Sequence, residues 1–529
     1  MYKSRKDKLR VSIENVFEQL KLMNDELSLI SGEEDDFLIN SKIAILNQDK
    51  LFKESISTSN ADESNPLIQS FIFTFIKEYN LKTKASKKIA QKNKINHESA
   101  SELAGYRSEN KDFLYPIVVK KSFRQCFVDI DDNEYVDMLC SFGSNLFGNN
   151  NLRINSALHR QIDRGFEIGS LHPSVSEVSN LINEITGNEL TAICNTVSEA
   201  VLCAIRIARK VTGRIKIISF KGSYSGIHDE VIVKTADNFI VLDYEDPNSM
   251  KKVEELIGEG DVAAILVEPV QFRNCGFDHK KVLKTLRNIT KSNKVCLIFD
   301  EVISGFRISI GGAQEYFGIS ADLCIYGKVL GAGMPIGAVS GKKEYMNALD
   351  GRGWQYADDS ASSIDVTNFA GIFVMQPLAI AAAQTALEIL KDAGQKKIDE
   401  LNSRSQNWVD SINFYCQKVE APIRFSNFGS LIKPKWLNDK FKYSDLFFAH
   451  LRLLGLHQYN GFSWFINLSH TDKDLSFTQD VIKKTIAIFQ LNGLMTGGKI
   501  ELDDSFYLKD EPKYSTLLNI GHKTNNNYI

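Results

Sequence analysis

Short apolar runs alternate with helical patterns through the middle of the chain, and this alternation restricts the fold more than any other feature. Four runs have the length and composition of buried strands: Ile215–Phe220, Val262–Val267, Val295–Phe299 and Leu323–Tyr326. The helical patterns that separate such runs cover Val201–Val211, Lys251–Ile257 and His279–Lys291. Because strands joined by helices form βαβ units, the sequence predicts an α/β fold built on a mostly parallel sheet.

The composition is that of an ordinary globular protein and excludes several classes of partner. The chain has 529 residues, enough for roughly three domains or one large α/β unit with extensions. It has 66 acidic and 63 basic residues, whereas a dedicated nucleic-acid-binding protein carries a basic surplus. No apolar stretch approaches the roughly 20 residues that span a bilayer. We therefore expect neither a nucleic-acid partner nor a membrane partner.

The eight cysteines are scattered along the chain, several of them inside apolar runs, and they form no C-x-x-C pair. This pattern is typical of buried thiols in a reducing compartment. It therefore predicts a cytoplasmic protein without a zinc site or any other metal site.

Composition also divides the chain along its length. Residues 1–110 are polar, 111–495 form a continuous globular body, and 496–529 form a tail. Six apolar residues at heptad spacing predict an amphipathic helix within residues 1–30: Ile13, Val16, Leu20, Met23, Leu27 and Ile30. This helix either docks on its own protein or serves as a dimerising or docking helix. The polar composition of residues 31–110 predicts a tether with short helices. We expect its run of lysines to be solvated: Lys82, Lys84, Lys87, Lys88, Lys92 and Lys94.

Two candidate functional residues come directly after predicted strands, where parallel sheets bind their ligands. Asp300 follows an apolar strand, and a carboxylate there serves either a cap or salt bridge or a ligand. Lys328 follows another strand and begins a turn that contains Gly331, Gly333 and Gly337. These glycines let the backbone approach a ligand closely. Because apolar walls lower the pKa of a lysine amine, Lys328 is a candidate nucleophile for a Schiff base.

Two further segments add groups of the same kind. Thr196, Val197 and Ser198 lead into a predicted helix, where hydroxyl residues either cap the helix or help to bind an anion. Tyr224 lies between two glycines after another strand. Together the four segments offer a phosphate site, an aromatic ring, a carboxylate and a lysine, which are the groups that pyridoxal 5′-phosphate (PLP) requires.

The sequence resembles the class III aminotransferases of the glutamate-1-semialdehyde aminomutase type, and looks closest to the aminotransferase domains of hybrid polyketide and peptide synthetases. The resemblance is carried by Asp132–Asp137, Phe142–Gly148, Ile265–Gln271, Ile298–Arg307 and Tyr326–Gly337. It implies the PLP-dependent transferase fold of type I, within a homodimer whose active site lies at the subunit interface. The large domain would cover about 165–385, and a smaller α+β domain would combine 111–164 with 386–495.

The resemblance also implies a role for each candidate residue. Lys328 would form the internal aldimine and carry the α-proton, and Asp300 would pair with the pyridinium nitrogen. Val302 and Tyr224 would lie on the two ring faces, and Gln271 would reach the 3′-oxygen of the ring, with Glu268 at the same strand end. The phosphate would be held by Thr196, Val197 and Ser198, and Ile372 would lie beside it from across the subunit interface, where the family has a phosphate-binding hydroxyl. Arg307 would be either a carboxylate clamp or part of a structural ion pair.

The sequence departs from the family pattern around the phosphate. Val197 and Ser198 replace a Gly-Thr pair, Ser225 replaces a histidine, and Ile372 replaces a threonine. A lost charge-assisted hydrogen bond is worth roughly 1.5–3 kcal/mol, so we expect weaker retention of PLP than in most of the family.

These observations predict a transaminase that moves an amino group from a donor amino acid to an aldehyde or ketone. The acceptor would be a small molecule or a carrier-bound acyl chain, and residues 1–30 would offer a contact for a synthase or carrier protein. Two alternatives stay open: an aminomutase that moves the amine within one substrate, and a non-catalytic scaffold or binding protein that kept the fold.

Overall fold

The computed structural model describes most of the chain from residue 65 onward. The described residues are 65–96, 110–223, 238–350, 354–361, 366–367, 371–437 and 441–497. The chain divides into two compact units, Met1–Ser70 and Phe71–Ile529, and the features below belong to the second. The predicted helix within residues 1–30, nearly all of the predicted tail, and Tyr224 and Ser225 lie outside the described residues.

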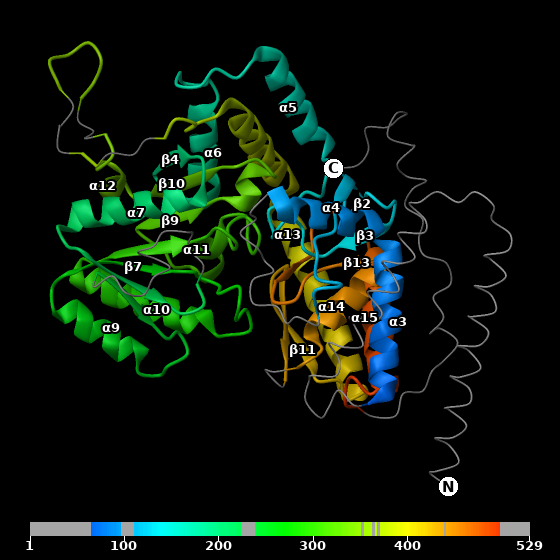
Figure 1. Cartoon of the computed structure of the whole chain (residues 1–529). Coiled ribbons are helices and arrows are strands. Elements are labelled where there is room, and N and C mark those ends of the chain that lie inside the picture. The colour runs from blue at the N-terminus through cyan, green and yellow to red at the C-terminus, as the bar shows by residue number, and fades with distance from the viewer. Residues whose placement is uncertain are drawn as a thin grey trace, which may run out of the picture. The chain divides into compact units, whose positions relative to one another are not determined.

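A seven-stranded sheet is the largest sheet among the described residues of the second unit (Figure 1). Its strands are β4 (Leu190–Cys194), β5 (Lys216–Phe220), β6 (Phe239–Leu242), β7 (Val262–Val267), β8 (Cys296–Asp300), β9 (Leu323–Tyr326) and β10 (Gly337–Gly341). Their order is β4-β10-β9-β8-β7-β5-β6. Neighbours from β6 to β9 pair in parallel, whereas β10 runs antiparallel to both β9 and β4. The predicted α/β fold with a mostly parallel sheet is therefore confirmed.

Three helices cover the sheet and correspond to the three predicted helical segments (Figure 1). They are α7 (Val197–Thr212), α9 (Ser249–Gly258) and α10 (His279–Asn293). Helix α7 buries an alanine- and isoleucine-rich face and contacts strands β4 and β7 to β10. It ends at Gly213, whose φ of 67° is the left-handed conformation that closes many helices. Every residue of β7 is buried, as expected for a central parallel strand.

Two smaller sheets are built from segments that flank the large sheet in the sequence. The first contains β1 (Val119–Phe123), β2 (Cys126–Asp129), β3 (Glu134–Asp137) and β13 (Leu456–His457). The second contains β11 (Ile423–Phe428), β12 (Leu431–Trp436) and β14 (Trp464–Phe465). Helices α14 (Ser444–Leu453) and α15 (Asp472–Leu491) pack against each other beside them. Buried aromatic side chains, among them Trp408, Phe425 and Trp464, fill the core of this region.

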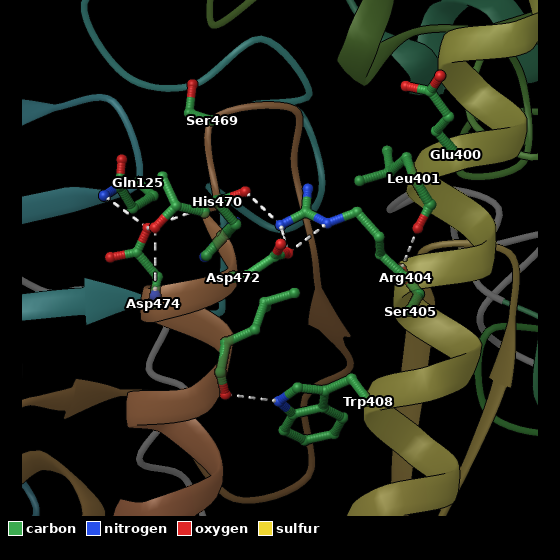
Figure 2. Close-up of polar contacts among 12 residues, drawn as sticks. Gln125, Glu400, Leu401, Arg404, Ser405, Trp408, Ser469, His470, Asp472 and Asp474 are labelled. Atoms are coloured by element: carbon green, nitrogen blue, oxygen red, sulfur yellow. Dashed lines mark hydrogen bonds and ion pairs between the residues drawn. The ribbon is translucent and has the colours of Figure 1, made fainter.

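Helix α13 (Pro377–Lys418) joins the two regions. It breaks at Gly394, whose φ of 70° and ψ of 168° are not helical. It contacts α5 (Leu152–Arg164), α6 (Val175–Thr186), β11 and α15. Figure 2 shows Arg404 of α13 donating to Asp472 Oδ1 at 3.0 Å and to the His470 carbonyl at 2.7 Å, at the start of α15. None of the described helices, α13 included, combines the length and the apolar composition needed to cross a membrane.

The body begins earlier in the sequence than the predicted boundary at residue 111. Helices α3 (Pro66–Lys82) and α4 (Lys84–Asn96) lie in the predicted tether, but from Phe71 onward they belong to the second unit. Arg452 Nε donates to the Tyr79 hydroxyl at 2.9 Å, and Asp131 Oδ1 accepts from the Ala85 N–H at 2.7 Å. Residues 71–96 are therefore packed structure rather than tether. Most of the lysine run is exposed, as predicted, although Lys82 donates to the Leu453 carbonyl at 2.8 Å.

Candidate active site

Three candidate side chains come from the carboxyl ends of three adjacent parallel strands. Glu268 follows β7, Asp300 ends β8, and Lys328 follows β9 by one residue after Gly327. Glu268 and Asp300 are buried, with exposed fractions of 5% and 4%. Asp300 Oδ1 accepts from the Val302 N–H at 3.2 Å, and Val302 is itself buried. The structure thus brings together four of the predicted site residues at one edge of the sheet.

The Lys328 amine is held in an environment that favours its neutral form. Burial lowers the pKa of Lys328 from 10.5 to about 8. The carboxylates of Glu268 and Asp300 act in the opposite direction, and the Arg307 guanidinium adds to the lowering of the pKa. A substantial fraction of the amine is therefore neutral near pH 8, as a nucleophile requires.

Val197, the first residue of α7, packs directly against the backbone that precedes Lys328. A Cβ atom added to Gly327 would lie 2.4 Å from Val197 Cγ2, so residue 327 must be glycine. A Cβ added to Gly337 would lie 2.3 Å from the Thr196 carbonyl oxygen. The amino end of α7 and the glycine-rich turn are therefore in close contact. The bulk of Val197 is accommodated by Gly327.

Thr196 caps α7, so the capping interpretation of this segment is correct for its side chain. The Thr196 hydroxyl accepts from the Glu199 N–H at 3.2 Å, and Glu199 Oε2 accepts from the Thr196 N–H at 2.9 Å. The cap does not remove the partial positive charge of the helix amino end, to which Ser198 adds a hydroxyl. An anion site at this point would therefore use Ser198 and the first backbone N–H groups rather than the Thr196 hydroxyl.

Gln271 ties together the loops that follow two neighbouring strands. It is buried, and its Nε2 donates to the Lys221 carbonyl at 3.1 Å. Its Oε1 lies 4.0 Å from the position of a Cβ added to Gly222. Gln271 therefore lies beside the segment that leads to Tyr224, which is outside the described residues.

An unusual turn, Cys140–Gly143, meets the Lys328 amine. Its four residues have φ values of 47°, 51°, 57° and 87°, all in the left-handed region. Three of them are not glycine, at a cost of roughly 1–2 kcal/mol each. Lys328 Nζ donates to the Phe142 carbonyl at 2.9 Å. Strained backbone at a candidate nucleophile is typical of functional sites. In the sequence, part of this turn was noted only because it carries the family resemblance. Gly143 is the one residue of the turn whose type favours a left-handed conformation.

The comparisons with known proteins agree with this geometry. Residues 106–413 match the model of the family described as aminotransferase class-III. The chain belongs to the class III aminotransferase family. It is 34% identical over 383 residues to a glutamate-1-semialdehyde 2,1-aminomutase of Methanococcus maripaludis, which covers 67% of this chain and 84% of the relative. It is 30% identical over 418 residues to the protein of that name from Fusobacterium nucleatum, which covers 72% and 92%.

Solved structures show the same fold. An omega-transaminase from Sphaerobacter thermophilus superposes with a TM-score of 0.68 at 22% identity, covering 76% of this chain and 97% of that one. A glutamate-1-semialdehyde-aminomutase from Pseudomonas aeruginosa gives a TM-score of 0.67 at 16% identity, covering 80% and 98%. The predictions of the family, of the type I fold and of PLP as cofactor are confirmed. The amine of lowered pKa, the carboxylate on the adjacent strand and the nearby helix amino end fit this cofactor.

Arg307 of this aminotransferase is not part of a structural ion pair, which was one of the two expectations for it. Its side chain is fully buried and forms no ion pair with a carboxylate of the described residues. Instead it donates to the Gly143 carbonyl at 2.7 Å, to the Ser430 hydroxyl at 2.9 Å and to the Ile466 carbonyl at 3.2 Å. Its guanidinium also lies 5.0 Å from the centre of the Phe465 ring. Arg307 therefore links the left-handed turn to the residue before β12 and the residue after β14. Burial lowers its pKa to about 10.

Glu301 was not singled out by its position in the sequence, and it has a structural role. Its buried carboxylate accepts from the Ser304 hydroxyl at 2.6 Å and from the Ala313 N–H at 2.7 Å, at the start of α11 (Gly312–Phe317). A Cβ added to Gly312 would lie 2.8 Å from Glu301 Oε1. Burial raises the pKa of Glu301 to about 7. Asp300 and Glu301 are adjacent in the sequence, yet only Asp300 ends the strand beside Lys328.

Ile372 lies in a short turn beside the start of α7. The exposed fraction of its side chain is 80%, and that of the neighbouring Phe373 is 54%. A Cβ added to Gly371 would lie 3.3 Å from Glu199 Oε1 of the same chain. The turn is thus close to the candidate phosphate site, but its isoleucine offers no hydrogen bond.

Proposed function

We propose that this aminotransferase is catalytically active and moves an amino group from a donor amino acid to an aldehyde or ketone. The observation that carries the proposal is the Lys328 amine, with a pKa of about 8, beside the strand end that bears Asp300. PLP, when bound, supplies the electron sink that such chemistry needs. A degenerate scaffold would have no reason to retain this pair of groups at a costly buried position.

In this proposal Lys328 holds the cofactor covalently and then moves the proton at the α-carbon of the substrate. A pKa of about 8 is suited to that work, because a general base is most efficient when its pKa lies near the working pH. The hydrogen bond from Lys328 Nζ to the Phe142 carbonyl orients the amine whenever it is not bound to the cofactor. Asp300, buried and held by the Val302 N–H, would keep the ring nitrogen protonated.

The remaining roles place side chains around the cofactor. Gln271 would contact the 3′-oxygen, Val302 and Tyr224 would cover the two ring faces, and Glu268 would adjust the charge near the amine. The phosphate would lie at the amino end of α7, held by Ser198 and the backbone of Val197. Thr196 would act there only indirectly, since its hydroxyl serves as the helix cap.

The acceptor class is proposed from the resemblance to aminotransferase domains of hybrid polyketide and peptide synthetases. It would be an aldehyde or keto group on a small molecule or on a carrier-bound acyl chain, with residues 1–30 as the carrier or synthase contact. The test is a half-reaction screen, in which purified protein with PLP is mixed with single amino acids and the cofactor absorbance is followed. Conversion by an amino acid supports transamination; a protein that gives no cofactor absorbance band at all would instead be a scaffold.

A second candidate function is an aminomutase. The observation that favours it is the name of the relatives at 30–34% identity, which are glutamate-1-semialdehyde 2,1-aminomutases. The two functions differ in their need for an external amino donor. Product formed from a single amino-aldehyde substrate, without any donor, would identify the aminomutase.

We also propose that the active form is a homodimer in the cytoplasm. The exposed apolar side chains of Ile372 and Phe373, next to the candidate phosphate site, support burial by a second copy of the chain. The eight cysteines, all buried and unpaired, support a reducing compartment. Light scattering after size exclusion, with and without PLP, measures the oligomeric state; a monomer in both conditions would contradict the dimer.

A further inference from the structure

Helix α10 carries a strongly basic face that borders a pocket. Four of its residues, Lys280, Lys284, Arg287 and Lys291, line a cavity of about 510 Å³, together with Asn288. The rest of the lining consists of residues 317–320 and of Lys342, which follows β10. The lining thus contains five cations and no acid, in a chain whose net charge is −3. We call this cavity the α10 pocket.

The charges of the α10 pocket are poorly compensated by the protein itself. Asp322 is shared by two of the five cations, Arg287 at 3.1 Å and Lys342 at 2.6 Å, and it also accepts from the Leu297 N–H at 2.8 Å. Within the part of the chain that the structure describes, Lys280, Lys284 and Lys291 take part in no ion pair. All three are exposed, so they remain accessible to a soluble anion.

The spacing of these cations destabilises α10 without an evident structural gain. Lys280 and Lys284, like Arg287 and Lys291, are four residues apart on the helix, where like charges repel. Other surface helices of the molecule compensate their lysines: Lys251 pairs with Glu255 in α9, and Lys483 pairs with Asp480 in α15. Helix α10 contains no acidic residue at all. A row of cations in which only Arg287 is paired, along a concave surface, is suited to an anion site.

The α10 pocket is separate from the candidate active site. Residues 320 and 322 precede β9, and Lys342 follows β10, which is antiparallel to β9. These residues therefore mark the edge at which β9 begins, whereas Lys328 lies beyond the edge at which it ends. An occupant of the α10 pocket would act from outside the catalytic centre.

We propose that the α10 pocket binds a small anion that carries two or more phosphate groups. Its volume lies within the roughly 300–1,000 Å³ of small-molecule sites, and lysines bind phosphate as point charges. The row of cations extends over three helical turns, which suits several phosphates better than one. Asn288 adds an uncharged donor, and the wall at 317–320 adds Phe317 and Ile319 for an apolar part of the ligand.

The test is a calorimetric titration of the full chain with inorganic tripolyphosphate. The protein is first saturated with PLP, so that the phosphate site at α7 is filled. Wild type is compared with Lys284→Gln and with Lys281→Gln, a matched control on the same helix that removes the same charge but does not line the pocket. Lysine and glutamine have similar helix propensities, so both variants should fold.

We expect Lys284→Gln to weaken binding roughly tenfold, because it removes one charge-assisted contact, and Lys281→Gln to weaken it less than about twofold. Binding should also weaken as salt is added. Equal losses in the two variants would show that the attraction is diffuse and would overturn the proposal, as would the absence of saturable binding to wild type at low salt.

Two further titrations identify the kind of ligand. Parallel runs with ADP and with tripolyphosphate distinguish a nucleotide from an inorganic anion, since either carries the proposed chemistry. An oligoglutamate peptide tests the competing occupant, an acidic protein segment. If the peptide binds more tightly than both phosphates and loses its affinity in Lys284→Gln, the surface receives a protein and the proposal is wrong.

Discussion

The charged groups near the two ends of β9 differ in how deeply they are buried. At its carboxyl end Asp300 and Arg307 are held by buried hydrogen bonds, and Lys328 donates to the Phe142 carbonyl. Burial lowers the pKa values of Lys328 and Arg307. At its amino end the α10 pocket presents Lys280, Lys284 and Lys291, which are exposed. The comparison teaches that burial, more than the number of charges, adapts a group for chemistry. Exposed charges instead remain accessible to a ligand.

Removal of the Lys328 amine should give the largest effect. We expect Lys328→Ala to lose covalent attachment of PLP and to reduce turnover at least about a thousandfold, because it removes both the nucleophile and the proton carrier. Borohydride reduction followed by peptide mapping measures the attachment. Lys342→Ala is the matched control, since Lys342 lies at the opposite edge of the sheet and pairs with Asp322. A pyridoxyl group found on Lys342 would overturn the assignment of Lys328 as the nucleophile. It would also contradict the division between a catalytic end and a binding end of β9.

Loss of the Arg307 guanidinium should mainly affect stability. Arg307→Met leaves the Gly143 and Ile466 carbonyls and the Ser430 hydroxyl without their buried donor. We expect the free energy of unfolding to fall by about 3 kcal/mol or more, with faster hydrogen exchange in residues 140–147. Arg273→Met, at an exposed arginine, is the control and should change stability by less than about 0.5 kcal/mol. Similar losses in both variants would mean that Arg307 does not clamp the turn.

The pH dependence of stability tests whether burial also changes the pKa of Glu301. Its pKa is raised to about 7 in the folded protein by burial, so the folded state binds a proton more readily than the unfolded state. The free energy of unfolding should therefore decrease as the pH rises from about 4.5 to 7, by about 3 kcal/mol from this group alone.

Glu301→Gln should remove that part of the pH dependence, because the amide oxygen still accepts from the Ala313 N–H but does not titrate. Denaturant titrations of both proteins across this pH range measure the difference. An unchanged slope of stability against pH in the variant would show that Glu301 is already ionised in the folded state at low pH.

The smallest expected effect concerns Ile372. Its exposed side chain lies in the turn beside the start of α7, where the family pattern has a threonine. Ile372→Thr should lower the dissociation constant of PLP about tenfold by adding one hydrogen bond to the phosphate. Equilibrium dialysis at matched protein concentration measures this constant. An equal or weaker affinity in the variant would mean that other residues have rebuilt the phosphate site.

Much of the central sheet could be predicted because its signals are local. The strands β7 and β9 begin and end at the predicted residues, and β5, β8 and the three helices differ from the predictions mainly at their ends. Each of these elements is a continuous apolar or amphipathic segment, so its pattern is complete within its own sequence. Strands β4, β6 and β10 were not predicted; β10 contains two glycines, which are unusual inside a strand.

The helices before residue 111 show where composition misleads. Helix α4 is rich in lysine, a composition that predicts a solvated tether. Yet Ser86 in this helix and Thr83, the residue directly before it, are completely buried. Asp131 caps this helix from a position 46 residues later in the chain. A polar sequence can therefore be packed when its few buried side chains find partners elsewhere, and composition alone does not report those partners.

The sequence by itself determined the α/β fold, the PLP chemistry and the identity of Lys328 and Asp300 as the residues to test, because strand ends and glycine-rich turns are local features. Only the tertiary structure decided how these groups are held. Lys328 meets the Phe142 carbonyl across 186 positions of sequence, and Arg307 meets Gly143 across 164. Such contacts depend on how distant segments pack, and the burial that results sets the pKa of the Lys328 amine. Neither the contacts nor the degree of burial can be read from a local sequence pattern.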